Sequence, residues 1–223
     1  MPLDAVCLRA VLTELDRKAA GGRIDKVYQP DRDEIVLSIR GTHGAMRLMV
    51  TAEPSAPRMH FIDANRENPA APPMFCMLLR KYVQGAKIVS ISQPALERMA
   101  VIDLDTTDEM GVPVRRQIVC ELMGKYSNII LKGGDGRVID AIRRIDGDIS
   151  GKRQVLPGLF YRLPPAQEGK TDPLTMDGAQ LLSMLRAAED EGKKLDKWLL
   201  SVLSGLSPLV CREIAYRAVG DAA

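Results

Sequence analysis

Apolar residues recur at helical spacing in the first twenty residues of the chain. This stripe predicts a helix that begins after a capping Asp4 and ends at Gly21-Gly22, and its members are Leu8, Val11, Leu12, Leu15 and Ala19. A second helix is predicted over residues 74–83, because Pro72-Pro73 suits a first helical turn and Gly85 suits an end.

Between and after these helices, apolar and polar residues alternate as in strands with one buried face. The predicted strands are 23–29 (stopped by Pro30), 34–40, 45–51, 58–62, 88–93, 98–104, 116–122, 128–131 and 138–142. Residues 41–44 and 133–136 predict hairpin turns. Because no βαβ alternation is present, we expect an α+β domain with antiparallel strands and two main helices. It would form either two small sheets or a β-sandwich flanked by the helices.

Proline and glycine are frequent between residues 156 and 169, and from about residue 173 the pattern is only helical. We therefore expect two domains, 1–172 and 173–223. In the second, Gly205-Leu206-Ser207-Pro208 separates two helices, which is typical of a helix-hairpin-helix segment. Such a turn can direct backbone N–H groups at a phosphate, or can simply join two packed helices.

Composition narrows the function classes. The 223 residues carry a formal net charge of only +2, so any nucleic-acid affinity must come from local clusters of Arg and Lys. No apolar run is long enough to span a bilayer, and the N-terminus lacks a secretory signal, so we expect a cytoplasmic protein with no membrane partner. We expect no metal and no cofactor, and buried reduced thiols at Cys7, Cys76, Cys120 and Cys211.

Two short segments carry most of the candidate chemistry. Glu121-Leu122-Met123-Gly124-Lys125-Tyr126 combines a glycine, a cation and a ring between two strand-like runs, which suits binding of a phosphate and a base. Glu97-Arg98 begins a predicted strand, so its side chains are expected to project to opposite faces. The pair is either two solvated charges, or a carboxylate that accepts from base edges beside a guanidinium that binds phosphate.

Other cations are candidates for additional RNA contacts. They are Arg23 and Lys26 after the glycine pair, and Arg80 and Lys81 near the end of the second predicted helix. The last two are also explained by the helix dipole, which favours cations at a C-terminus.

Pro2 suggests a different chemistry. If Met1 is removed, its secondary amine could form a Schiff base with a sugar aldehyde, with Asp4 as a candidate carboxylate. The alternative function is therefore a DNA glycosylase/AP lyase, although proline at position two is common.

Several segments together resemble the NFACT family, in order and over essentially the whole chain. They are residues 21–30, 72–81, 121–131, 156–158 with 164–165, 205–208 and 213–215. The resemblance implies that residues 1–172 form an NFACT-N domain, similar in fold to the N-terminal domain of formamidopyrimidine-DNA glycosylases. The remainder would begin the family's helix-hairpin-helix domain. Full-length members continue into a coiled coil and an NFACT-R domain, so we expect this chain to be an N-terminal fragment.

The family resemblance also implies a function. Members act in ribosome-associated quality control: they bind a large ribosomal subunit that carries a stalled nascent chain, and they recruit aminoacyl-tRNA. In bacteria this is alanyl-tRNA, used for C-terminal tailing. The ribosome performs the peptide-bond chemistry, so no enzyme activity is implied. An older family name implies a fibronectin-binding adhesin, which is a third alternative.

The family's residue pattern is carried over with small differences. An Asp-Arg pair important for tRNA recognition falls on Glu97-Arg98, where the acid is one methylene longer. A Glu-Ile-Met-Gly segment falls on Glu121-Leu122-Met123-Gly124, and the arginine that usually follows is Lys125, which lacks the bidentate fork. The resemblance thus implies tRNA binding, through the anticodon arm, by Glu97, Arg98 and residues 121–126.

Overall fold

The computed structural model describes residues 3–42, 44–64, 66–147, 153–165, 167–188 and 192–220. Its helices are α1 (Ala5–Ala19), α2 (Met74–Val83), α3 (Gly178–Ala187), α4 (Leu195–Val202) and α5 (Pro208–Val219), with a short 3-10 helix η1 (Gly124–Tyr126). Its strands are β1 (Arg23–Asp31), β2 (Glu34–Gly41), β3 (Gly44–Thr51), β4 (Arg58–Phe61), β5 (Lys87–Ser92), β6 (Met99–Thr107), β7 (Pro113–Glu121), β8 (Asn128–Gly133) and β9 (Val138–Ala141). The α+β class and the antiparallel pairing are confirmed.

The strands form one sheet in the order β4-β3-β2-β1-β5-β6-β7-β8-β9, so the expectation of two separate small sheets was wrong. The two groups of strands meet at β1 and β5, where only Arg23 and Lys87 pair in register and Ile24 N donates to Ala86 O at 3.0 Å. This short junction explains why the chain pattern looks like two independent groups.

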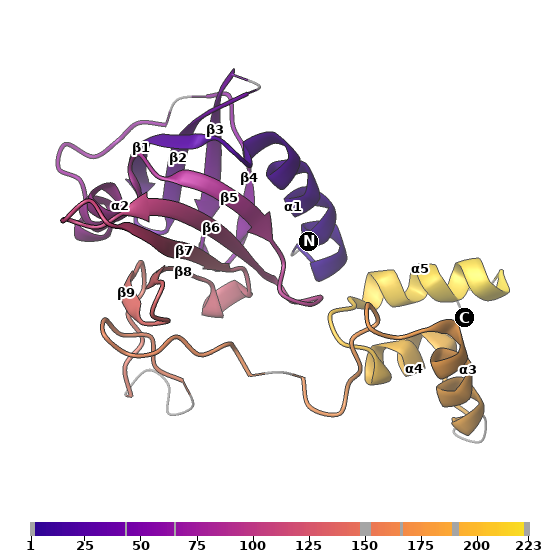
Figure 1. The fold of residues 1–223 in the computed structure, drawn as a ribbon. Coiled ribbons are helices and arrows are strands. Elements are labelled where there is room, and N and C mark those ends of the chain that lie inside the picture. The colour runs from indigo at the N-terminus through magenta and orange to yellow at the C-terminus, as the bar shows by residue number, and fades with distance from the viewer. Residues whose placement is uncertain are drawn as a thin grey trace.

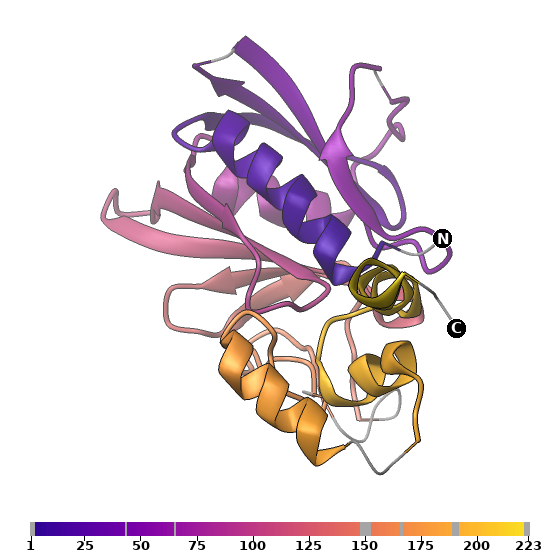
Figure 2. The same ribbon diagram turned by 90° about the vertical axis from the view of Figure 1, so that its right-hand side faces the viewer.

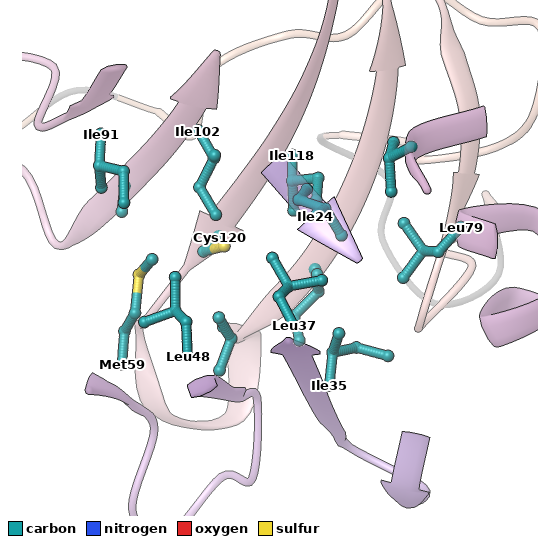
Figure 3. Packing of buried hydrophobic residues seen from close by; sticks show 14 of the residues in the cluster. Ile24, Ile35, Leu37, Leu48, Met59, Leu79, Ile91, Ile102, Ile118 and Cys120 are labelled. Atoms are coloured by element: carbon teal, nitrogen blue, oxygen red, sulfur yellow. The ribbon is translucent and has the colours of Figure 1, made fainter. Parts of the chain in front are cut away.

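The two halves of the sheet face each other across one core, as a sandwich would (Figures 1 and 3). Leu37 of β2 and Leu48 of β3 belong to the same buried cluster as Ile102 of β6 and Ile118 of β7. Helix α1 packs against β5 and β4, whereas α2 packs against β1, β6 and β9, so the helices cover different sides of this core (Figures 1 and 2). The buried face of α1 is the predicted stripe of Leu8, Leu12 and Leu15.

Strand β1 does not stop at Pro30, as the sequence predicted, but continues to Asp31. The register between β1 and β2 shifts after the pair Tyr28 and Val36 and resumes at Asp31 and Glu34. A bulge of this kind tolerates a residue that has no N–H to donate, which explains how the strand accommodates the proline.

The four cysteines are free, but only Cys76, Cys120 and Cys211 are buried. Cys7 is exposed, because it lies outside the apolar stripe of α1, so the prediction of burial was wrong there. Within the described ranges, no helix combines the length and the apolar character that crossing a membrane requires.

The C-terminal helices are tied to the start of α1. Asp4 Oδ1 accepts from Cys7 N at 2.8 Å, which is the predicted cap, and Oδ2 accepts from Ser207 Oγ at 2.8 Å. Ser207 Oγ also caps α5 by accepting from Val210 N. The two helix starts therefore share one hydrogen-bonded unit, and both ribbon views place α5 beside the first turn of α1 (Figures 1 and 2).

The turn before α5 also packs against the loop before β6. Gly205 has a φ of +74°, and a Cβ at this position would lie 2.1 Å from the carbonyl oxygen of Leu96. Only glycine fits so close an approach. The predicted domain boundary at residue 172 stays a prediction, although Thr171 already bonds to α4, with its N–H donating to Val202 O at 2.9 Å.

Replacing Asp4 by alanine should lower the free energy of unfolding by about 1–2 kcal/mol, because the change removes the cap of α1 and a bond to Ser207. Thermal unfolding followed by circular dichroism measures the effect. Asp177→Ala is the matched control, since Asp177 caps only the exposed helix α3. Equal losses of thermal stability in the two variants would contradict the shared cap.

Candidate functional site

The β6–β7 hairpin brings the two candidate segments together. Met99 pairs with Glu121, and Leu122 N donates to the carbonyl oxygen of Arg98 at 2.8 Å. The start of one antiparallel strand lies beside the end of its neighbour. Residues 97–98 and 121–126 therefore share one end of the hairpin, although they are far apart in sequence.

A pocket of about 200 Å³ opens at this end of the hairpin, and Glu97, Arg98 and Met123 line it together with Leu163 and Pro164. Glu97 and Arg98 thus face the same pocket, and the expectation that they project to opposite faces was wrong. Both residues precede β6, so the alternation of side chains along a strand does not apply to them.

The loop that carries Glu97 is held in an unusual shape. Ala95 also lines the pocket, and its φ of +49° makes it the one non-glycine residue with positive φ in the described ranges. Gln93 Nε2 donates to Ala5 O at 2.9 Å and to Glu97 O at 2.8 Å. The loop is therefore fixed to the start of α1 on one side and packed against Gly205 on the other.

The pocket contains two charged side chains, those of Glu97 and Arg98. The Arg98 guanidinium makes no hydrogen bond or ion pair with any residue in the part of the chain that the structure describes. Partial burial raises the pKa of the Glu97 carboxyl, the Arg98 charge opposes this rise, and the nearby Asp172 charge adds to it. The pocket thus offers a half-buried cation to a ligand beside a carboxyl that holds its proton more strongly than usual.

Glu121 has the opposite character, because it is fully buried and fully paired. Arg153 Nη1 donates to Oε2 at 3.0 Å, Arg153 Nη2 donates to Oε1 at 2.5 Å, and the Tyr161 hydroxyl donates to Oε1 at 2.8 Å. Burial raises the pKa of Tyr161, and the Glu121 charge raises it further, so the phenol stays protonated and donates. We call these three residues the Glu121 cluster.

Leu122 is buried as well, so neither Glu121 nor Leu122 presents its side chain to an external ligand, as the sequence interpretation supposed. The sequence did not identify Arg153 and Tyr161 as their partners, because no spacing pattern links them to residue 121. The cluster holds residues 153–163 against the end of β7, and this segment supplies Leu163 to the pocket. Glu121 therefore contributes to the pocket indirectly, because it holds the segment that carries Leu163 in place.

The rest of the turn reaches the surface. Gly124 has a φ of +59° at the start of η1, and Ser127 Oγ accepts from Met123 N at 2.9 Å. Lys125 is exposed, with its Nζ 5.0 Å from the centre of the Tyr126 ring, and Tyr126 is 65% exposed. We refer to Glu97, Arg98, Met123, Lys125 and Tyr126 as the hairpin-end site.

The other predicted cations lie elsewhere. Arg80 Nε donates to Val27 O at 2.9 Å, and Lys81 pairs with Glu109 at 2.6 Å near the opposite tip of the β6–β7 hairpin. Arg23 donates to Gly85 O at 3.0 Å, and Lys26 lies on the outer face of β1. A strand of this length spans about 30 Å, so Lys81 lies that far from the hairpin-end site.

Pro2 lies outside the described residues. Asp4, its candidate partner in lyase chemistry, uses both carboxylate oxygens to hold the starts of α1 and α5. The structure therefore gives Asp4 a structural role.

Comparison with known proteins agrees with this architecture. The family described as NFACT N-terminal and middle domains matches residues 4–222. The chain belongs to the NFACT family. It is 36% identical over 219 residues to the Rqc2 homolog RqcH of Bacillus subtilis, covering 98% of this chain and 38% of that protein. It is 28% identical to the archaeal Rqc2 homolog aRqcH of Methanocaldococcus jannaschii, covering 98% of this chain and 31% of the relative.

Among solved structures, the chain resembles the N-terminal domain of the fibronectin-binding protein PavA from Streptococcus pneumoniae. The TM-score is 0.89 at 32% identity, and the match covers 98% of this chain and 80% of the other. This NFACT chain spans 31–39% of the length of the curated relatives it matches. The helix-hairpin-helix assignment and the likeness to DNA glycosylases stay predictions.

Glu121→Gln should lower the free energy of unfolding by about 3 kcal/mol, because it leaves the Arg153 charge without its buried partner. Urea denaturation measures the loss. Glu213→Gln is the control, since it breaks an exposed Glu–Arg pair on α5 and should have little effect. Similar losses in both variants would show that the Glu121 cluster is not a special support.

Glu97→Gln should make the protein more stable at pH 7. The folded-state pKa of Glu97 is raised, so its ionisation disfavours the folded state, and this cost develops as pH rises through that pKa. The advantage of the variant should shrink as pH falls and disappear below about 4, once the wild-type carboxyl is protonated in the unfolded state as well. Melting temperatures across this range test the sign, and a variant that is less stable at pH 7 would contradict it.

Proposed function

We propose that this chain is the RNA-binding module of a ribosome-associated quality-control factor, and that its hairpin-end site holds a tRNA. The single observation that carries the proposal is the half-buried Arg98 guanidinium, which makes no hydrogen bond or ion pair within the described residues and shares a pocket with Met123, just before the exposed Lys125 and Tyr126. A guanidinium without a hydrogen-bonded partner suits a phosphate oxygen, and an exposed ring offers a face to a base.

The shape of the site favours RNA over a small substrate. The pocket is small and mostly apolar, and the cation and ring of the turn lie outside it on the surface. Folded RNA can place an unstacked base in such a pocket while its backbone contacts the neighbouring cations. Glu97 then accepts from a base edge or a ribose hydroxyl, and the apolar Met123 packs against the base.

Membership of the NFACT family and likeness to RqcH proteins support the wider role. In this role, the full-length factor binds the stalled large ribosomal subunit in the cytoplasm and recruits alanyl-tRNA for C-terminal tailing of the nascent chain. The chain described here contributes binding and positioning, and the ribosome forms the peptide bonds.

The second candidate is fibronectin binding, which the name of the PavA neighbour favours. The two candidates differ in what occupies the hairpin-end site. A tRNA requires the Arg98 charge and loses affinity as salt rises, because cation–phosphate contacts release counterions. Saturable binding of fibronectin by the purified chain, with no affinity for tRNA, would favour the second candidate.

Arg98→Glu should weaken tRNA binding about tenfold or more, because one charge-assisted contact becomes a repulsion. It should lower the melting temperature only modestly, because Arg98 makes no hydrogen bond or ion pair in the described part of the protein and loses only its charge interaction with Glu97. Fluorescence anisotropy with labelled alanine tRNA at fixed salt measures the affinity.

Arg115→Glu is the matched control for this variant. Arg115 is exposed near the opposite end of the same hairpin, where it pairs loosely with Asp105 at 3.4 Å. The Arg115→Glu variant changes the net charge by the same amount as Arg98→Glu, but it should barely change the affinity for tRNA. If both reversals weakened binding to the same extent, the hairpin-end site would be no more than part of a general electrostatic surface.

A further inference from the structure

A second pocket of about 330 Å³ lies on the outer face of β1, β2 and β3, in the other half of the sheet from the hairpin-end site. Ile62, Ala64, Arg66 and Asn68, from the segment after β4, form its wall. The face is separate from the main core, because Val36 lines the pocket and is absent from the cluster that contains its neighbours Ile35 and Leu37.

The strand register arranges this face in two rows. Lys26 pairs with Ser38, which pairs with Arg47, so a polar row crosses the three strands. Two residues further along, Tyr28 pairs with Val36, and this row is apolar and aromatic. Side chains two residues apart lie on the same face, and the rows are about 7 Å apart.

The polar row carries two cations, Lys26 and Arg47, that form no ion pair with the residues the structure describes. Two acids close to this row, Asp25 in the pocket lining and Glu34 on β2, are paired with arginines. Asp25 accepts from Arg40 at 3.0 Å, and Glu34 accepts two bonds from Arg66 at 2.9 and 3.1 Å.

The two remaining cations keep their charge exposed to the pocket. Among the residues that the structure describes, Lys26 has no ion pair, and Arg47 donates from Nη1 only to the backbone oxygen of Asp63. Lys26 and Arg47 flank the Ser38 hydroxyl, and neither makes an ion pair within the described ranges, which favours an anion above Ser38.

We infer that this pocket binds a nucleotide, with the phosphate between Lys26 and Arg47 and the base against Tyr28 and Val36. The spacing between the rows matches the extension of a nucleotide from phosphate to base, and a ring beside an apolar wall offers a stacking surface. The nucleotide is either a free mononucleotide or one residue of an RNA strand. The site shares no residue with the hairpin-end site, so it does not depend on the function proposed above.

Nuclear magnetic resonance of the ¹⁵N-labelled chain tests the inference, with AMP and a six-nucleotide single-stranded RNA as separate probes. We expect saturable shifts of the amides of Lys26, Tyr28, Ser38 and Arg47 with at least one probe. Shifts with AMP assign a mononucleotide site, and shifts with the RNA alone assign a site for one residue of a strand. Absence of these shifts with both probes overturns the inference.

Variants separate the parts of the site. Lys26→Glu should weaken binding about tenfold, whereas Lys197→Glu, an equal charge change at an exposed position of α4, should not. Tyr28→Leu should remove the preference for AMP over inorganic phosphate. Equal affinity of the wild type for AMP and inorganic phosphate overturns the base subsite.

The Arg98→Glu variant distinguishes this inference from the proposed function. It should lose tRNA binding at the hairpin-end site and keep the shifts of Lys26 and Ser38. If Arg98→Glu abolished those shifts, the two sites would not be independent, and the inference would fail in this form.

Discussion

Glu121 is buried at the end of β7, and its two carboxylate oxygens receive three hydrogen bonds from Arg153 and Tyr161. A buried carboxylate without partners is costly, so the segment that supplies these donors must stay packed against β7. This constraint places Leu163 and Pro164 beside Arg98 and Met123 and so forms the pocket. The candidate site therefore depends on an interaction that is itself hidden from any ligand.

Other charged side chains of the protein also fall into two groups: those that pair within the fold, and those that can bind a ligand. Asp4 holds two helix starts, and Glu34 receives both bonds of the Arg66 fork. In contrast, Arg98 and Lys125 make no hydrogen bond or ion pair within the described residues, and the Lys125 Nζ lies 5.0 Å from the centre of the neighbouring Tyr126 ring. The paired charges stabilise the fold. Cations without an ion pair, in a pocket or on the surface around it, are the ones that can bind an anion.

Much of the fold could be predicted from local pattern. The spacing of Leu8, Leu12 and Leu15, with Asp4 before them, defines α1 because helix periodicity and capping are local properties. The single sheet could not be predicted in this way, since the junction of β1 and β5 depends on pairing between distant residues. The passage of β1 through Pro30 depends on a bulge that the neighbouring strand determines.

The candidate site was predictable in part. The types of residue at 97–98 and 123–126 indicate a surface for phosphate and base, and the hairpin brings them together. The burial of Glu121 could not be foreseen, because its donors lie in a later segment with no periodic link to β7. The shared orientation of Glu97 and Arg98 does not follow from strand alternation, because both residues precede β6.

Ultraviolet cross-linking of the chain to a bound tRNA, followed by mass spectrometry of the tryptic peptides, tests the central claim most directly. If the hairpin-end site holds the RNA, adducts should form on Tyr126, in the peptide that covers residues 126–132. Adducts confined to α3, α4 and α5, with none on residues 94–132, would contradict the account.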